Sequence, residues 1–437
     1  MIKKLVIVFI AFIAIQSYAQ QGTASPYSFY GIGSLKFKGT VENRSMGGLS
    51  IYTDSIHVNL RNPASYAGEN LAIWGNETRP VKFSVGGSYS SINLKSNTSS
   101  DKATATTFDY LALSVPIGKF GLGFGLMPYT SVGYKLESLD ESGNLVNKFR
   151  GEGGVNKAYL GLGYMLAKGL SIGIDAQYNF GNIQNTTIEF QYDEDGIPIQ
   201  YKSRESNRSD LSGLNFNLGL HYKKIIYRNI EFTSGITFTP KSSLTSKNER
   251  LFSTITINPT TEQEFAINTI EQDLEAIGLQ ETDLILPSKF SFGAGFGVPR
   301  KWFIGTEYTT QKTSNFSNPL YSTSTTKFEN ASTISLGGFY IPNYNALNGY
   351  FKRVVYRAGI RSEKTGLNIK NESIKEFGIS FGVGLPVGDV RMFSNANLGF
   401  EIGKRGTTNS SLIQENFVNF QLSLSLNDRW FNKRKYD

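Results

Sequence analysis

Cysteine is absent from the 437 residues, and charged residues are scarce. The absence of cysteine excludes disulfides, thiolate metal sites, a cysteine nucleophile and a lipidated N-terminal cysteine. Charged residues make up 18% of the chain, below the roughly 25% that is usual in soluble domains. Beyond the N-terminus, no stretch approaches the roughly 18 apolar residues that suggest a membrane helix. These absences disfavour both an array of soluble domains and a helical membrane protein.

Histidine is also rare, and the two that occur, His57 and His221, have no recognisable nucleophile as a partner. We therefore expect no enzymatic activity and no cofactor. The acidic run from Asp193 to Gly196 lacks the spacing of a complete calcium-binding loop. A solvated turn is expected there, and no metal site.

The first 19 residues have the three parts of a cleaved secretory signal. Lys3 and Lys4 are basic, Leu5–Ile15 is apolar, and Ser17-Tyr18-Ala19 places small residues before a cleavage site at Gln20. The apolar stretch is short for the alternative, an uncleaved membrane anchor. Loss of the two lysines would reduce the net charge from +8 to +6, and this charge is scattered. We expect no nucleic-acid partner.

Glycine and aromatic residues are abundant, with 45 glycines and 13% aromatics. Several segments alternate strictly, such as Leu214–Tyr222, with apolar and polar residues, and Phe377–Leu385, with apolar residues and glycine or serine. Successive side chains of a strand point to opposite faces, so each segment has one apolar wall and one polar or small wall. This pattern is typical of a transmembrane barrel, in which alternate residues face lipid.

The number and spacing of these segments predict an all-β fold, a 14-stranded antiparallel transmembrane β-barrel over residues 81–427. Very short connections alternate with longer polar segments. This is expected of a barrel whose tight turns face the periplasm and whose long loops face the outside. The even strand number would leave both mature termini in the periplasm. The predicted strands are residues 81–94, 105–117, 120–134, 155–166, 170–182, 211–223, 230–242, 286–298, 301–313, 329–341, 352–364, 374–386, 392–405 and 414–427.

Three connections, residues 135–154, 183–210 and 243–285, are predicted to be long extracellular loops. In the last, four apolar residues recur at helical spacing before Gly278, which predicts an amphipathic helix. Its apolar stripe would either pack on the barrel rim or form one wall of an apolar entry groove. These four residues are Ile267, Ile270, Leu274 and Ile277.

Residues 20–80 lack regular alternation, and we interpret them as a plug inside the barrel. A periplasmic extension is the alternative, but a lumen of fourteen strands would leak unless filled. After the last strand, residues 428–437 form a basic periplasmic tail with Trp430 and Phe431. This tail is either a solvated chain end or a docking peptide for a periplasmic partner.

The sequence resembles the FadL-type family of outer-membrane transporters for hydrophobic compounds. The resemblance implies a plugged barrel of 14 strands that passively transports hydrophobic or amphiphilic molecules such as long-chain fatty acids. It rests on motifs in the plug and on the Leu-Pro that opens a barrel strand, namely Met46-Gly47-Gly48, Asp54-Ser55, Asn62-Pro63-Ala64 and Leu286-Pro287.

The resemblance also implies a sideways exit through the barrel wall at a kinked third strand. The third predicted strand contains Gly123, Gly125 and Pro128. Proline cannot donate a ladder hydrogen bond, so Pro128 indicates either a lateral opening or an ordinary bulge. On another strand, Arg353, Arg357 and Arg361 are predicted to face the lumen, where they either hold the plug or bind ligand.

Two functions remain open from the sequence. The first is passive outer-membrane transport of a hydrophobic molecule. The second is a non-transporting accessory barrel in a larger outer-membrane or secretion complex, contacting other envelope proteins through its loops or basic tail. In both, outer-membrane lipid and lipopolysaccharide surround the barrel.

Overall fold

Side chains at successive positions of the barrel strands lie in opposite environments. On one strand, Leu214 and Leu218 face outward and are 58% and 43% exposed, whereas the intervening Asn215 and Asn217 face the lumen and are 5% and 7% exposed. An apolar exterior around a polar interior is the arrangement that a membrane barrel requires. The alternation in the sequence therefore corresponds to the two faces of one wall.

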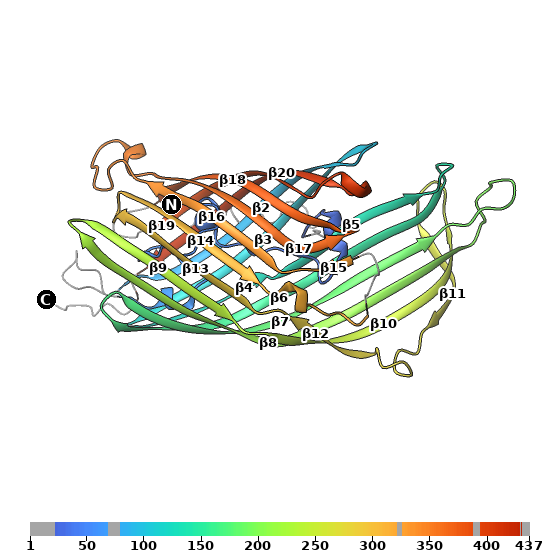
Figure 1. Cartoon of the computed structure of the whole chain (residues 1–437), viewed down its shortest axis with the longest axis horizontal. Coiled ribbons are helices and arrows are strands. Elements are labelled where there is room, and N and C mark those ends of the chain that lie inside the picture. The colour runs from blue at the N-terminus through green and yellow to red at the C-terminus, as the bar shows by residue number, and fades with distance from the viewer. Residues whose placement is uncertain (1–21, 69–78, 321–325, 388–393, 429, 431–437) are drawn as a thin grey trace.

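A computed structural model describes residues 22–68, 79–320, 326–387, 394–428 and 430. The predicted signal peptide and nearly all of the predicted basic tail lie outside these residues. Within them, a ring of fourteen antiparallel strands forms the barrel (Figure 1): β2 (Val81–Lys95), β3 (Ser100–Ile117), β4 (Phe120–Pro128), β6 (Leu145–Ala167), β7 (Leu170–Glu189), β8 (Lys202–Tyr227), β9 (Ile230–Thr239), β13 (Lys289–Val298), β14 (Trp302–Gln311), β16 (Ala331–Tyr340), β17 (Val355–Ile369), β18 (Glu372–Val387), β19 (Ser394–Arg405) and β20 (Gln414–Asp428).

The remaining elements are short or lie outside the ring. The strands are β1 (Ser34–Leu35), β5 (Thr130–Leu139), β10 (Ser242–Ile257), β11 (Glu264–Glu271), β12 (Glu281–Leu286) and β15 (Thr326–Phe328). The helices, each of one turn, are η1 (Pro26–Phe29), α2 (Val41–Arg44), η2 (Pro63–Tyr66), η4 (Thr313–Asn315), η5 (Tyr350–Lys352) and η6 (Asn409–Ser411). None of the described helices is long and apolar enough to cross a membrane.

The barrel is closed by the pairing of its first and last strands. β20 pairs with β19 on one side and with β2 on the other, where Leu424 lies opposite Val85. Closure satisfies the backbone hydrogen bonds of the wall, which is a requirement in lipid. The prediction of an antiparallel barrel of fourteen strands is confirmed.

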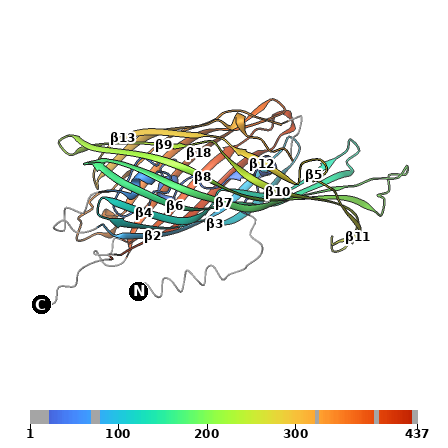
Figure 2. The same cartoon turned by 90° about the horizontal axis from the view of Figure 1, so that it is seen from below.

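The structure differs from the sequence prediction in the three segments expected to be loops, which are mostly strand. β6, β7 and β8 have 23, 20 and 26 residues and continue far beyond the barrel. With β5, β10 and β11 they form a sheet, here called the projecting sheet, that extends past one rim on one side (Figures 1 and 2). Polar residues predominate on both faces of the extensions of β6, β7 and β8, so the two-residue hydrophobic period is too weak to reveal them.

The predicted amphipathic helix is wrong. Ile267 and Ile270 lie on β11, Leu274 is buried in the turn that follows, and Ile277 is exposed. β11 pairs with β10, with Ile270 opposite Phe252. The ladder with a neighbouring strand thus prevails over the helical spacing, as tertiary context often does for short apolar segments.

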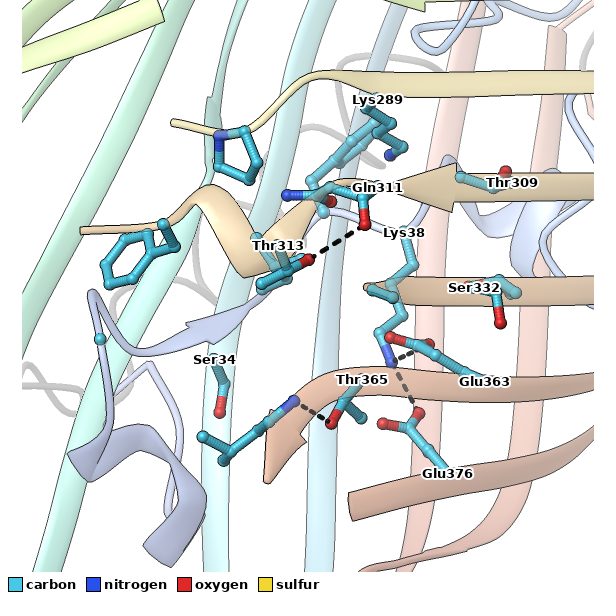
Figure 3. A pocket seen from close by; sticks show the side chains of 18 of the residues that line it. Ser34, Lys38, Lys289, Thr309, Gln311, Thr313, Ser332, Glu363, Thr365 and Glu376 are labelled. Atoms are coloured by element: carbon cyan, nitrogen blue, oxygen red, sulfur yellow. Dashed lines mark hydrogen bonds and ion pairs between the residues drawn. The ribbon is translucent and has the colours of Figure 1, made fainter. Parts of the chain in front are cut away.

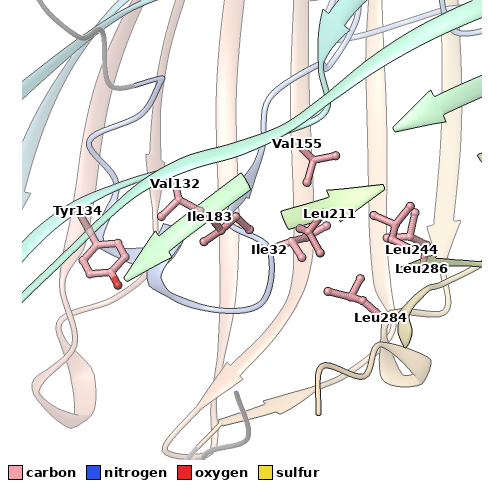
Figure 4. Close-up of a cluster of buried hydrophobic side chains, with 9 residues drawn as sticks. All are labelled: Ile32, Val132, Tyr134, Val155, Ile183, Leu211, Leu244, Leu284 and Leu286. Carbon is pink, nitrogen blue, oxygen red and sulfur yellow. The ribbon is translucent and has the colours of Figure 1, made fainter. Parts of the chain in front are cut away.

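An apolar cluster lies where the projecting sheet meets the barrel (Figure 4). Val155, Leu211 and Leu244 come from β6, β8 and β10, and Ile32 comes from the N-terminal segment. Val155 and Leu244 are fully buried. The N-terminal segment therefore forms part of the same core as the base of the sheet.

Substitution of a lipid-facing residue tests the assignment of the two faces. Leu218 lies in the middle of the outward apolar stretch of β8, so Leu218→Arg should destabilise the folded barrel by about 2–4 kcal/mol. Urea titration of folding into lipid vesicles measures this. Ile199→Arg, at an exposed site between β7 and β8, is the control and should leave the midpoint unchanged. Equal stability of both variants would contradict the lipid-facing assignment.

Candidate functional site

Residues 22–68, here called the plug, lie inside the barrel and contact walls on opposite sides. The backbone approaches so closely that the wall needs glycine. A Cβ atom at Gly121 would clash with the Tyr66 carbonyl group, and one at Gly123 would clash with the Tyr66 ring. Gly161 of β6 touches the same ring. Lumen-facing glycines of the wall thus leave the space in which η2 packs.

The Asn-Pro-Ala motif builds this contact. The Asn62 side chain caps η2, because its Oδ1 accepts a hydrogen bond from the Ala64 N–H at 3.0 Å. Its Nδ2 donates to the Leu220 carbonyl oxygen of β8 at 3.1 Å. Pro63 and Ala64 lie against Gly173, where a side chain would leave no room. The motif therefore fixes one end of the plug to the wall.

The glycine pair holds the opposite side of the plug. Gly47 and Gly48 have φ of +69° and +87°, a conformation that favours glycine. The Gly47 N–H donates to Ser380 Oγ of β18 at 2.9 Å. A Cβ on Gly47 would lie 2.5 Å from the Ile360 carbonyl oxygen, and the backbone at Met46 lies against Gly359. Here too the backbones of plug and wall are in direct contact.

Arg361 is the centre of a buried ion network on the wall. It is 7% exposed and contacts Glu363 at 2.5 Å, Glu376 at 2.6 Å and Glu401 at 2.8 Å. Arg405 lies 3.9 Å from Glu376. Two wall guanidinium groups cannot neutralise three carboxylates, so the wall needs further cations.

The plug supplies these further cations. Lys38 contacts Glu376 at 2.6 Å and Glu363 at 3.4 Å (Figure 3). Arg44 contacts Asp109 of β3 at 3.1 Å and Glu401 at 3.8 Å. With these two cations, four wall carboxylates face four cations. Wall and plug therefore share one balanced charge cluster.

A second ion pair lies deeper. Arg61 contacts Glu307 of β14 at 2.6 Å, and Glu307 is 3% exposed. The other carboxylate oxygen accepts from the Ser50 N–H and Oγ at 2.7 Å and 2.9 Å. Each Glu307 oxygen is thus bonded to the plug.

Two of the three predicted lumen arginines are buried inside. Arg361 lies in the network above, and Arg357 is 6% exposed and donates to Asn397 at 3.1 Å. Asn397 in turn donates to Glu42 of the plug at 2.7 Å. Arg353 precedes β17 at the short-turn rim, where its guanidinium lies 5.7 Å from the Tyr350 ring.

The plug leaves three cavities. One of about 190 Å³ lies toward the long-loop end, and Phe316 and Phe328 form part of its wall. Charged residues such as Lys38 and Glu376 also line it (Figure 3). One of about 120 Å³ borders Phe37 and Lys157. The third, of about 110 Å³, lies toward the short-turn end. Both apolar and charged side chains line each of the three cavities.

Asp54 and His57 line the third cavity. Asp54 Oδ2 lies 2.7 Å from His57 Nδ1. Burial raises the pKa of the Asp54 carboxyl, but His57 lowers it more, and the balance holds it well below its usual range. His221 instead contacts Thr53 and the Ile51 carbonyl oxygen, so it fastens the plug.

The predicted third strand is interrupted at its proline. β4 ends at Pro128, and β5 begins at Thr130. β4 pairs with β3 only from Leu111 onward, and no ladder joins the preceding half of β3 to β5 among the described residues. Gly123 faces the plug, and a Cβ at Gly125 would clash with the Leu111 carbonyl oxygen.

The start of the plug lies in this break. β1 pairs with β5, with Ser34 opposite Ser131, and the Lys36 N–H donates to the Tyr129 carbonyl oxygen at 3.0 Å. Gly22 lies between Ser131 of β5 and Thr107 of β3. The plug thus occupies the gap in the wall, which sequence reasoning did not foresee because it depends on contacts distant in the chain.

Among the described residues, no group of three potential ligands could hold a metal ion. The acidic run that begins at Asp193 forms a turn, in which Asp193 Oδ1 accepts from the N–H groups of Asp195 and Ile197.

The family model for BamG matches residues 1–437. The chain belongs to the BamG family. No curated protein sequence matches it. Its fold can therefore be compared with solved structures only.

Several solved outer-membrane proteins have a similar fold. The toluene transporter TodX of Pseudomonas putida has a TM-score of 0.56 and 14% identity, over 92% of this chain and 100% of TodX. The toluene transporter TbuX of Ralstonia pickettii has 0.57 and 14%, over 90% and 99%. A FadL homologue of Pseudomonas aeruginosa has 0.56 and 12%, over 90% and 99%. The BamG-family chain therefore has the FadL-type fold, as the resemblance predicted.

Loss of the Arg61 charge should loosen the plug. Arg61→Gln leaves buried Glu307 without its ion-pair partner, which should cost about 3–5 kcal/mol. We expect faster proteolysis between residues 22 and 68 in the folded barrel, measured by mass spectrometry. Arg208→Gln removes an arginine from an exposed pair with Asp210 and should change nothing. Equal resistance of Arg61→Gln and the unmodified protein would show that this pair does not hold the plug.

Proposed function

We propose that the protein is a non-transporting, plugged barrel that acts as a subunit of a larger outer-membrane assembly. The observation that carries this proposal is the fixation of the plug. Backbone contacts hold it on opposite walls, and its cations complete the charge balance of buried wall carboxylates. Movement of the plug would expose or unpair these groups, at a cost of several kcal/mol for each buried charge left alone.

The chemistry of the lumen also favours this function. An apolar molecule in the cavity of about 190 Å³ would lie beside Lys38, Arg361 and Glu376. Displacement of Lys38 by such a molecule would leave Glu376 with less neutralising charge. A permanently filled lumen avoids this cost.

The surface outside the barrel suits a subunit. We infer that the short turns and both mature termini lie in the periplasm, so that the projecting sheet lies outside the cell. Exposed apolar residues gather near its tip, among them Phe252, Ile267 and Ile270. Contiguous apolar surface of this kind marks sites of protein contact. The basic tail would offer a second contact in the periplasm.

The assembly is one that secretes proteins, inserts barrels into the outer membrane or builds the cell surface. Of these three roles, the family name BamG favours barrel insertion.

Passive transport of a hydrophobic molecule is the second candidate. Its support is the FadL-type fold, shared with structures named as toluene transporters, and the break between β3 and β5 beside Pro128. In this alternative the first residues of the plug withdraw, and the molecule leaves sideways into the membrane. The aromatic side chains Phe316 and Phe328 in the cavity of about 190 Å³ would bind this molecule. Long-chain fatty acids are one such class of molecule.

A reversible disulfide between the plug and the wall, here called the lock, distinguishes the subunit function from transport. Because the chain has no cysteine, Ser34→Cys with Ser131→Cys creates a unique pair at opposed positions of β1 and β5. Oxidation should join the plug to the wall. We expect the locked protein to restore the outer-membrane protein profile of a deletion strain as fully as the single variants do.

Purification in mild detergent supplies the second measurement, by mass spectrometry of co-purifying proteins and bound lipids. A stoichiometric complex that survives the lock supports the subunit. Loss of function on oxidation that is reversed by reductant, together with a lone barrel carrying stoichiometric lipid, would establish transport instead.

A further inference from the structure

β11 has a free edge at the outer end of the projecting sheet. It pairs with Leu251–Ile257 of β10, and no strand covers its other edge in the part of the chain that the structure describes. Figure 2 shows it at the far end of the molecule from the short turns. Within the membrane, closure of the barrel leaves no free strand edge. Outside the barrel, the free edge of β11 presents unpaired backbone N–H and C=O groups.

Apart from a bulge at Ile267, the edge lacks the features that normally protect such strands. Between Glu264 and Glu271, the six residues Phe265–Ile270 contain no charge and no proline. Ile267 and Ile270 are each 62% exposed. Natural proteins block exposed edges with lysine, proline or bulges, because an open apolar edge pairs with other chains.

The opposite edge of the sheet is protected. The outer half of β5 carries Lys135 and Glu137, and Glu137 lies 3.4 Å from Lys148 of β6. The two edges of the sheet therefore differ in chemistry. The uncharged stretch Phe265–Ile270 of β11 therefore has no counterpart in the outer half of β5.

β11 is also joined to its neighbours by ion pairs at one end. Glu264 accepts two hydrogen bonds from the Arg150 guanidinium, at 2.6 Å and 3.0 Å, and one from Arg204 at 3.1 Å. These arginines belong to β6 and β8, so the contacts fix β11 across the sheet. A pre-ordered edge loses little entropy when a partner binds.

We propose that β11 binds an extended segment of another protein by strand addition outside the barrel. The segment is free of proline, apolar at alternate positions and basic opposite Glu271. Backbone hydrogen bonds to β11 supply affinity, and Phe252 and Ile270 contact its side chains. This inference rests on the proposed subunit function and names the surface that the assembly uses.

A second copy of the chain fits this edge poorly. Antiparallel pairing of two β11 strands over their whole length would place Glu264 opposite Glu271 at both ends. Like charges directly opposite each other destabilise a strand pair. A different protein with a basic residue avoids this repulsion.

Site-specific cross-linking tests the proposal. A photoreactive amino acid replaces Asn268 on β11 or, as the matched control, Ser138 on β5, in cells that contain the whole assembly. We expect Asn268 to cross-link to one stretch of one protein, with the sequence properties given above, and Ser138 to give no such product. Cross-linking to another copy of this chain would overturn the proposal.

Two further measurements separate strand addition from looser contact. Ile267→Lys with Ile270→Lys should reduce the cross-link at Asn268 at least tenfold, whereas Leu139→Lys, at an exposed site on β5, should not. Amide hydrogen exchange in Glu264–Glu271 should slow in the purified assembly relative to the isolated barrel. An intact assembly with unchanged exchange would refute strand addition while leaving the subunit function in place. Absence of any assembly would refute both.

Discussion

The neutralisation of buried wall carboxylates is the constraint on which the interior depends. Glu363, Glu376 and Glu401 surround Arg361, which is largely buried, and a surplus of buried negative charge there would be costly. Lys38 and Arg44 remove the surplus, so wall and plug form one electrostatic unit. The plug is therefore part of the fold rather than an addition to a finished barrel.

This constraint explains how the FadL-type fold could serve the proposed non-transporting subunit. The same architecture can release a plug that is weakly held or retain one that is strongly held, and the difference lies in side chains, not in topology. Here the glycines that admit the plug backbone and the shared charges act together.

Some features of the site were visible in the sequence because they depend on local chemistry. The Asn-Pro-Ala motif and the glycine pair require particular backbone geometry, and both lie at plug–wall contacts. Other features were hidden. The partners of Arg361, the occupation of the break beside Pro128 by Gly22 and the strand at Ile267 all arise from residues far apart in the chain, to which periodicity is blind.

The sequence by itself determined the barrel, its strand number and the existence of a separate N-terminal segment. Lipid lies on one face of the wall, and water or packed polar groups lie on the other. These two environments impose a two-residue alternation of side chains that can be recognised within a strand. Only the tertiary structure decided how firmly the plug is held, where the wall is interrupted and which edge remains open. These properties depend on which side chains meet across the lumen and on how far the strands continue where no membrane imposes the pattern.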